Sequence, residues 1–209
     1  MEYIKVSRQN LKLKPSEDTG FIIWNLPATS TCPYRTGHCS KDCYALKAER
    51  VYKAVLPSRQ RNMEISLADD FVERMTATIR HILRTGRKPY LIVRIHESGD
   101  FYNEEYADKW LEIMRNCRDL PEIKFIAYTK SFPYFDGKVL PYNFSLRASV
   151  WDDTPEWALE MIVRNKWPIY TAVEKFTDSD TFTHCRCEDC ATCGQCWNNS
   201  IKEIACEIH

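Results

Sequence analysis

Apolar segments with the composition of β-strands alternate with segments of helical periodicity, and this order constrains the fold more than any other feature. The predicted strands cover residues 21–26, 90–96, 123–129, 144–150 and 168–173. The predicted helices cover residues 44–56, 58–84, 103–116 and 154–165, with Pro57 separating the first two. Alternation of this kind predicts a parallel sheet with crossover helices. Five strands cannot close an eight-stranded barrel, so we expect an α/β fold with a partial (β/α) barrel of about five or six mostly parallel strands.

The cysteines divide the chain into two expected parts. Residues 1–180 would form the barrel, with a cluster-binding loop at 32–43, and residues 181–209 would form a cysteine-rich extension packed on it. The 29 basic and 29 acidic side chains cancel, so net charge does not indicate a nucleic-acid partner. No segment resembles a signal peptide or is long and apolar enough to span a membrane, so we expect a cytoplasmic protein without membrane contacts.

Nine of the ten cysteines fall into two groups, and the tenth, Cys117, is expected to be a small buried residue. The first group is Cys32, Cys39 and Cys43, and the second is Cys185, Cys187, Cys190, Cys193, Cys196 and Cys206. In a reducing compartment, grouped cysteines are more typical of metal ligands than of disulfides. Soft thiolates select zinc, copper(I) or an iron–sulfur cluster.

The C-terminal spacing favours a [4Fe–4S] cluster. From Cys187 to Cys196 a cysteine recurs at every third residue, as in the C-x2-C-x2-C segment with which ferredoxins bind a cubane cluster. Zinc sites usually separate two C-x2-C pairs by a dozen or more residues, so zinc is the less favoured metal. The fourth ligand, beside Cys190, Cys193 and Cys196, is either Cys185 or Cys187.

The N-terminal loop offers only three thiols. A cubane cluster bound by Cys32, Cys39 and Cys43 would leave one iron open to an exchangeable ligand or a substrate. Alternatively, a distant cysteine completes an ordinary electron-transfer or structural site, the candidates being Cys117, Cys185 and Cys206. A single site shared between the two groups is a third alternative, so one or two clusters are expected.

Charged residues follow several predicted strands, where parallel sheets usually carry their functional groups. Strand alternation directs Arg94 and His96 to one face of the sheet, together with Tyr128, Lys130, Ser145 and Arg147. Three buried cations in one cavity would suggest an anionic ligand, while ion pairs at the solvent rim are the alternative. The candidate catalytic residues are Arg94, His96, Lys130, Arg147 and Glu174.

Several motifs in this order resemble those of the phage "gene product eighty-eight" family. They are the three N-terminal cysteines with Tyr-Ala after the third, Arg-Ile-His-Glu-Ser-Gly-Asp-Phe at 94–101, Ala-Tyr-Thr-Lys-Ser at 127–131, and a C-terminal Cys-x2-Cys-x2-Cys-Trp ending at Trp197. The resemblance implies a metal-binding phage or bacterial protein, which would work in the cytoplasm of a bacterial host if phage-encoded.

The layout is also similar to that of the radical S-adenosylmethionine superfamily. There, a three-cysteine loop after the first strand of a partial barrel holds a [4Fe–4S] cluster with one open iron. The resemblance implies that Ser98, Gly99 and Asp100 bind the amino group of S-adenosylmethionine. In the enzyme hypothesis, a basic interior residue such as Arg147 would bind its carboxylate. That superfamily uses C-x3-C-x2-C, whereas this chain has C-x6-C-x3-C.

These patterns support three functional hypotheses. The first is an iron–sulfur enzyme that cleaves S-adenosylmethionine reductively on an unknown small-molecule or macromolecular substrate, with an electron donor as partner. The second is a non-catalytic iron–sulfur protein for electron transfer, sensing or structure. The third is a zinc-binding interaction module.

Overall fold

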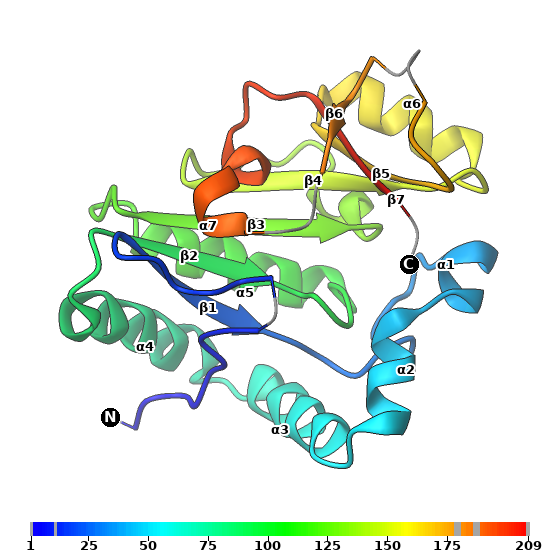
Figure 1. The fold of residues 1–209 in the computed structure, drawn as a ribbon. Coiled ribbons are helices and arrows are strands. Elements are labelled where there is room, and N and C mark those ends of the chain that lie inside the picture. The colour runs from blue at the N-terminus through cyan, green and yellow to red at the C-terminus, as the bar shows by residue number, and fades with distance from the viewer. Residues whose placement is uncertain (1, 11, 178–180, 186–188, 208–209) are drawn as a thin grey trace.

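The computed structural model describes residues 2–10, 12–177, 181–185 and 189–207. Its centre is a seven-stranded sheet in the order β1-β2-β3-β4-β5-β7-β6, which curls into a half-barrel (Figure 1). The strands are β1 (Thr19–Trp24), β2 (Tyr90–Ile95), β3 (Ile123–Thr129), β4 (Phe144–Val150), β5 (Ile169–Val173), β6 (Thr183–His184) and β7 (Glu203–Glu207). All six neighbouring pairs are parallel, which confirms the predicted parallel partial barrel.

The two strands at the far edge, β6 and β7, were not predicted. They come from the cysteine-rich segment that we expected to pack on the barrel as an extension, but they are part of the same sheet. These strands lack the apolar pattern that predicts a strand, because β6 has only two residues and β7 has a glutamate at each end. Residues 183–207 therefore contribute to the sheet and also carry the second group of cysteines.

Seven α-helices and two 3-10 helices lie in the described part of the chain. They are α1 (Gly37–Lys41), α2 (Tyr44–Val51), α3 (Val55–Leu67), α4 (Phe71–Gly86), α5 (Glu104–Asn116), η1 (Phe132–Phe135), α6 (Glu156–Asn165), α7 (Cys190–Cys193) and η2 (Gln195–Trp197). None of the helices in the described ranges combines the length and the apolar character needed to cross a bilayer.

The predicted break at Pro57 is wrong. Pro57 lies in the first turn of α3, where a missing N–H costs no helical hydrogen bond. The helix predicted over residues 58–84 is instead divided at Ala68, whose backbone is extended. Helix α4 begins three residues later and buries Phe71, Met75 and Ile79 at helical spacing.

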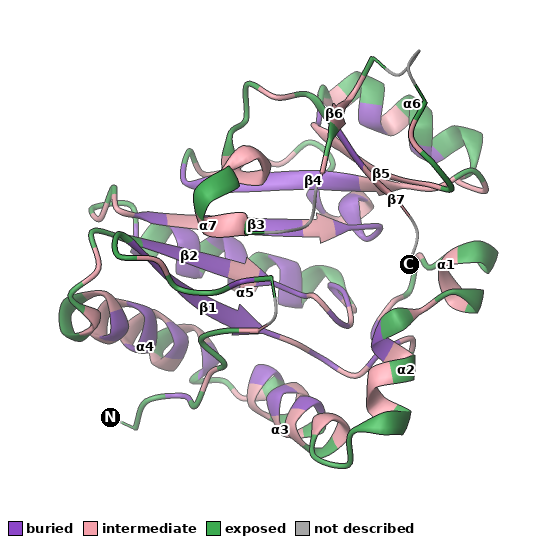
Figure 2. Ribbon diagram, viewed as in Figure 1, coloured by how far each residue is buried: buried purple, intermediate pink, exposed green. Residues whose placement is uncertain are grey.

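The two faces of the sheet are covered by different parts of the chain. Helices α4, α5 and α6 cover the convex face and form the main apolar core with alternate residues of β1 to β4. The concave face carries a smaller apolar cluster, which packs against Cys190, Cys196 and Trp197 of the C-terminal segment. Figure 1 shows this segment, in orange, lying across β3, and Figure 2 shows the buried strands between the two layers.

His96 departs from the strand alternation that we expected. Strand β2 ends at Ile95, and His96 has a left-handed backbone, with φ of 61°. This turn directs the imidazole toward the helices, where its Nε2 lies 3.0 Å from the Tyr106 hydroxyl of α5. His96 therefore lies in the helix-covered core and does not face the concave side.

The burial of His96 predicts a pH dependence of folding. Burial, with a smaller contribution from the Arg94 charge, lowers the pKa of His96 to about 3. The unfolded chain binds a proton at His96 below about pH 6.5, whereas the folded protein does so only near pH 3. The contribution of neutral His96 to the free energy of unfolding is therefore complete above about pH 6.5 and is lost as the pH falls toward 3. Between pH 7 and pH 5, we expect the free energy of unfolding to fall by about 2 kcal/mol more in the wild type than in His96→Asn. Urea unfolding at the two pH values measures this difference, and equal losses would contradict it.

Candidate metal centres

The N-terminal cysteine loop connects β1 to α2 at the carboxyl end of the sheet. Cys32 lies in a turn, Cys39 lies in the short helix α1, and Cys43 is the N-cap residue of α2. Arg35 fixes the turn by donating from Nη1 to the carbonyl oxygens of Thr29, at 2.9 Å, and Cys32, at 3.2 Å. The side chain of Arg35 thus holds the backbone of this turn in place.

The three thiols of this loop affect one another electrostatically. Burial raises the pKa of Cys32 to about 12, and the charges of Asp100, Cys39 and Cys43 add to the shift. Burial also raises the pKa of Cys39, and the positive charge of Lys130 opposes this increase. A metal ion reverses this effect, because a coordinated thiol is deprotonated. The loop therefore gathers three candidate ligands beside one carboxylate and one ammonium.

The segment Ser98-Gly99-Asp100 contacts the start of the cysteine loop, at Leu26 and Thr31. The Ser98 hydroxyl donates to the Leu26 carbonyl at 2.9 Å, and the Leu26 amide donates to the Ser98 carbonyl at 2.9 Å. Gly99 has φ of 77°, and a Cβ at this position would lie 2.5 Å from Thr31 Oγ1 and 2.6 Å from Leu26 Cβ. Only glycine allows this close approach, which sets the start of the cysteine loop.

Asp100 is buried and accepts four hydrogen bonds from the protein itself. The donors are the backbone amides of Phe101, Lys130 and Ser131, at 2.8, 2.9 and 3.2 Å, and the Thr129 hydroxyl at 2.5 Å. Burial raises the pKa of Asp100, and these hydrogen bonds oppose the shift. The carboxylate ties the loop after β2 to the end of β3. Binding of an amino group by Ser98, Gly99 and Asp100 remains a prediction.

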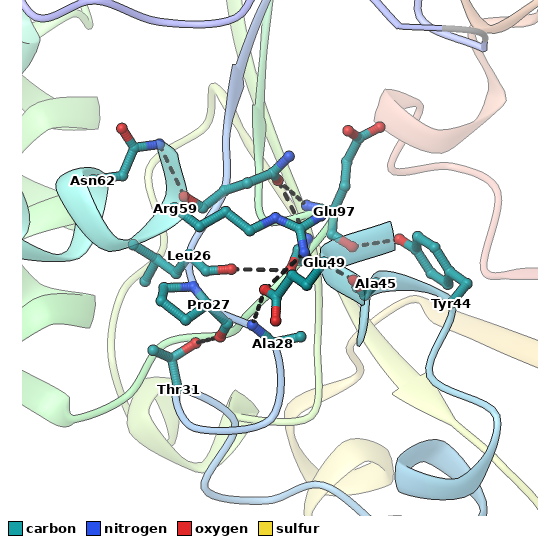
Figure 3. A network of polar contacts seen from close by, with 12 residues as sticks. Leu26, Pro27, Ala28, Thr31, Tyr44, Ala45, Glu49, Arg59, Asn62 and Glu97 are labelled. Carbon is teal, nitrogen blue, oxygen red and sulfur yellow. Dashed lines mark hydrogen bonds and ion pairs between the residues drawn. The ribbon is translucent and has the colours of Figure 1, made fainter. Parts of the chain in front are cut away.

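A buried ion pair holds the helix that follows the cysteine loop (Figure 3). Arg59 of α3 donates to Glu49 of α2 at 2.8 Å and to the Ala45 carbonyl at 2.9 Å. The same Glu49 oxygen accepts the Ala28 amide at 2.8 Å. The Tyr44 hydroxyl donates to the Glu97 carbonyl. These contacts orient α2, and with it Cys43, against the end of β1.

Lys130 is a predicted catalytic candidate whose charge acts on Cys39 of the N-terminal loop. Its Nζ donates to the Ser149 carbonyl at 3.2 Å and lies 5.6 Å from the centroid of the Trp151 ring. Burial lowers the pKa of Lys130, while the charges of Cys39, Asp153 and Asp100 oppose this shift. A cavity of only about 20 Å³ adjoins it, lined by Tyr34, Thr36, Lys130, Phe132, Ser149, Thr154, Pro155, Trp157 and Ala158.

Cys190 and Cys196 of the C-terminal group pack against the concave face of the sheet. Cys190 and Cys193 lie in α7, which Asp189 caps by accepting the Ala191 amide at 3.0 Å, and Cys196 lies in η2. The Trp197 ring packs edge-on against Phe21 of β1 with 6.3 Å between ring centroids. This segment fills the side of a half-barrel on which we had expected an open cavity.

Arg147 of β4 anchors this segment. The side chain is completely buried, and its guanidinium donates to four backbone carbonyls, those of Cys196 at 2.6 Å, Asn198 at 2.9 Å, Ile201 at 3.0 Å and Gln195 at 3.1 Å. Carbonyl oxygens therefore satisfy the charge that suggested an anionic ligand. Arg147 positions the cysteine segment.

The other predicted catalytic residues do not meet in one cavity. Arg94 faces the concave side, with its guanidinium carbon 3.8 Å from the centroid of the Tyr128 ring. His96 lies in the helix-covered core, and Glu174 is exposed beyond the end of β5. Cys117 is buried at the end of α5, as predicted.

The thiols of the C-terminal segment form their own group. Burial raises the pKa of Cys190 to about 11, and Cys196, Cys185 and Cys193 add to the shift. Cys206 of β7 lies next to Cys185, because the Cys185 amide donates to the Ala205 carbonyl at 2.7 Å. From the sequence, Cys206 was one of three candidates to complete the N-terminal site, and its role was otherwise open. Cys187, also a predicted ligand, lies outside the described residues.

The spacing of the thiols bears on the kind of metal. Among the described residues, no three cysteine sulfurs lie within 4.8 Å of one another. Four thiolates on one zinc ion lie only about 3.8 Å apart, given Zn–S bonds of about 2.3 Å in a tetrahedron. A cubane cluster binds each thiolate through a different iron, which requires a wider arrangement. The preference for an iron–sulfur cluster over zinc therefore stays a prediction from the sequence.

Comparison with known proteins places the chain among phage proteins. The family model "Gene product 88" matches residues 4–199. The chain belongs to the Gene product 88 family. It is 33% identical over 105 residues to the "Gene 88 protein" of Mycobacterium phage L5, and 31% identical over 105 residues to that of Mycobacterium phage D29. Each match covers 48% of this chain and 43% or 42% of the relative, so the chain spans less than half of each relative's length. No solved structure matches it.

Gly99→Ala is expected to destabilise the protein strongly. The new Cβ would clash with Thr31 and Leu26, in addition to the strain of a left-handed alanine. Gly137→Ala is the matched control, because Gly137 has φ of 69° and nothing within 4 Å of the added carbon. We expect the control to cost about 1 kcal/mol and Gly99→Ala about 1–3 kcal/mol more in urea unfolding. Equal costs would show that the close approach is unimportant.

Arg147→Met is expected to release the C-terminal segment, because it leaves four buried carbonyls without their donor. We expect a loss of at least about 3 kcal/mol and faster hydrogen exchange at residues 189–201. Arg164→Met, which removes an exposed arginine paired with Asp136, should cost less than about 0.5 kcal/mol. Unchanged exchange in Arg147→Met would contradict the anchoring role.

Proposed function

We propose that this protein of the Gene product 88 family is an iron–sulfur protein with two cluster sites. Cys32, Cys39 and Cys43 would bind one [4Fe–4S] cluster at the carboxyl end of the strands. Cys190, Cys193 and Cys196 would bind the other on the concave face, together with a further cysteine. The observation that supports this most directly is the placement of the described thiols in two groups, one in the loop between β1 and α2 and the other against the apolar cluster of the concave face.

Two separate sites account for the arrangement better than one shared site. The thiols that raise the pKa of Cys32 are Cys39 and Cys43, whereas those acting on Cys190 come from the C-terminal segment. Each group is also held by its own scaffold. The buried pair of Glu49 and Arg59 supports the first, and Arg147 supports the second.

Electron transfer is the function that this arrangement favours. The C-terminal group packs against an apolar layer that includes Ile92 and Ile126, and such burial tunes the reduction potential of a cluster.

Reductive cleavage of S-adenosylmethionine is the second candidate. The observation in its favour is the three-thiol loop at the carboxyl ends of parallel strands, which would leave one iron without a cysteine ligand. When bound there, the cluster would supply the electron for cleavage. Lys130 would place a positive charge beside Cys39.

The composition of protein purified without oxygen tests the proposal. We expect iron and acid-labile sulfide in equal amounts and broad visible absorbance. Replacing Cys32, Cys39 and Cys43 together by alanine, or Cys190, Cys193 and Cys196 together, should each remove part of the iron, while Cys117→Ala should remove none. Stoichiometric zinc without sulfide would instead establish the zinc-binding alternative.

The same preparations separate the two candidate functions. Protein reduced with dithionite is mixed with S-adenosylmethionine, and methionine and 5′-deoxyadenosine are measured. Formation of both products, abolished by the triple replacement at Cys32, Cys39 and Cys43, would establish the enzyme. If the protein contains both clusters but neither binds nor cleaves S-adenosylmethionine, the enzyme hypothesis is rejected. A role in electron transfer, sensing or structure is then retained.

A further inference from the structure

Cys206 lies on the concave face of the sheet, close to the C-terminal cysteine group. In the register of β5 and β7, Cys206 lies opposite Ala172, and Ile204 lies opposite Tyr170. Alternation along a strand therefore places Tyr170 and Cys206 on the same face. The strand on which Cys206 lies is paired on both sides, by β5 and by β6, so its position is fixed by the sheet.

Two tyrosines border this group of thiols. The rings of Tyr128 on β3 and Tyr170 on β5 meet edge to face, with 4.4 Å between their centroids. The Arg94 guanidinium covers the ring of Tyr128 at 3.8 Å. Three side chains from three strands thus form one layer, which lies beneath the segment held by Arg147.

Each tyrosine lies on the same face of the sheet as one of these cysteines. Tyr128 packs against the same apolar cluster as Cys196, and Tyr170 lies on the strand next to Cys206 with its side chain on the same face. The Cys185 amide donates to the Ala205 carbonyl at 2.7 Å, which places Cys185 next to Cys206. A tyrosine hydroxyl donates to a thiolate, and hydrogen bonds to ligand sulfurs set the reduction potential of a cluster.

We infer that Cys206 is a ligand of the C-terminal iron–sulfur centre, and that Tyr128 and Tyr170 are positioning residues that donate hydrogen bonds to the thiolates of Cys196 and Cys206. This inference rests on the proposed function and specifies the second of its two sites. It extends the ligand set from the continuous segment at 190–196 to a thiol on a distant strand. The centre would then join the last strand of the sheet to the segment on its concave face.

The arrangement also explains why two aromatic hydroxyls lie on this face. Hydrogen bonds to the thiolates stabilise the more negative, reduced state of a cluster, so they raise its reduction potential. The Arg94 cation near Cys190 and Cys196 acts in the same direction. The C-terminal centre would therefore have a higher potential than it would have with phenylalanine at positions 128 and 170.

The ligand role is tested with Cys206→Ala in the full chain, purified without oxygen. We expect it to lose the same fraction of iron and the same signal in the electron paramagnetic resonance spectrum of the reduced protein as Cys190→Ala. Cys117→Ala is the control and should retain both, because Cys117 lies in the helix-covered core. Wild-type iron content and spectrum in Cys206→Ala would overturn the ligand assignment.

The tyrosine role is tested with Tyr170→Phe and Tyr128→Phe, which keep the ring and remove only the hydroxyl. We expect full iron content in both and a more negative reduction potential for one centre, measured by redox titration of the resonance signal. Tyr142→Phe removes an exposed hydroxyl that donates to the Arg118 carbonyl, and it should leave both potentials unchanged. Unchanged potentials in both test variants would overturn the hydrogen-bonding role, and this test holds even if Cys206→Ala does not fold.

Failure of this inference is distinguishable from failure of the proposed function. Wild-type protein without iron and sulfide would reject the function itself. Wild-type protein with two clusters, combined with unaffected Cys206 and tyrosine variants, would reject only the ligand set and the hydrogen bonds proposed for the second site.

Discussion

The buried guanidinium of Arg147 is the interaction on which the arrangement of the C-terminal half depends. A charge with no exposed surface is costly to bury, and here it is balanced by four backbone carbonyls of one segment. These hydrogen bonds add to the apolar contacts that the same segment makes with the concave face. With it in place, Cys190 and Cys196 contact the apolar cluster of the sheet, and Trp197 packs against β1.

The carboxyl end of the sheet is organised by a different constraint, the close approach of two loops. Gly99 allows the loop after β2 to touch Leu26 and Thr31, and Asp100 connects the same loop to the end of β3. The N-terminal cysteine loop begins at this contact and ends at α2, which the buried pair of Glu49 and Arg59 orients (Figure 3). Gly99 and Asp100, which the resemblance assigns to cofactor binding, also hold the loop after β2 against the start of the cysteine loop.

The two thiol groups therefore have different surroundings, which suggests different properties. The N-terminal group lies beside Lys130 and Asp100 at the end of the strands. The C-terminal group lies over Tyr128, Tyr170 and two arginines on the concave face. Because local charge, hydrogen bonds and burial set reduction potentials, two clusters in these positions would differ in potential.

The sequence by itself determined the parallel α/β architecture, because strands β1 to β5 have local apolar and β-branched patterns that do not depend on distant contacts. It also determined that the cysteines form two groups. Only the tertiary structure decided that β6 and β7 complete the sheet, since two short polar strands are stable only when paired. It also decided that His96 turns into the helix layer and that Arg147 binds carbonyls, because a positive φ and a long-range hydrogen-bond partner leave no periodic signal in the chain.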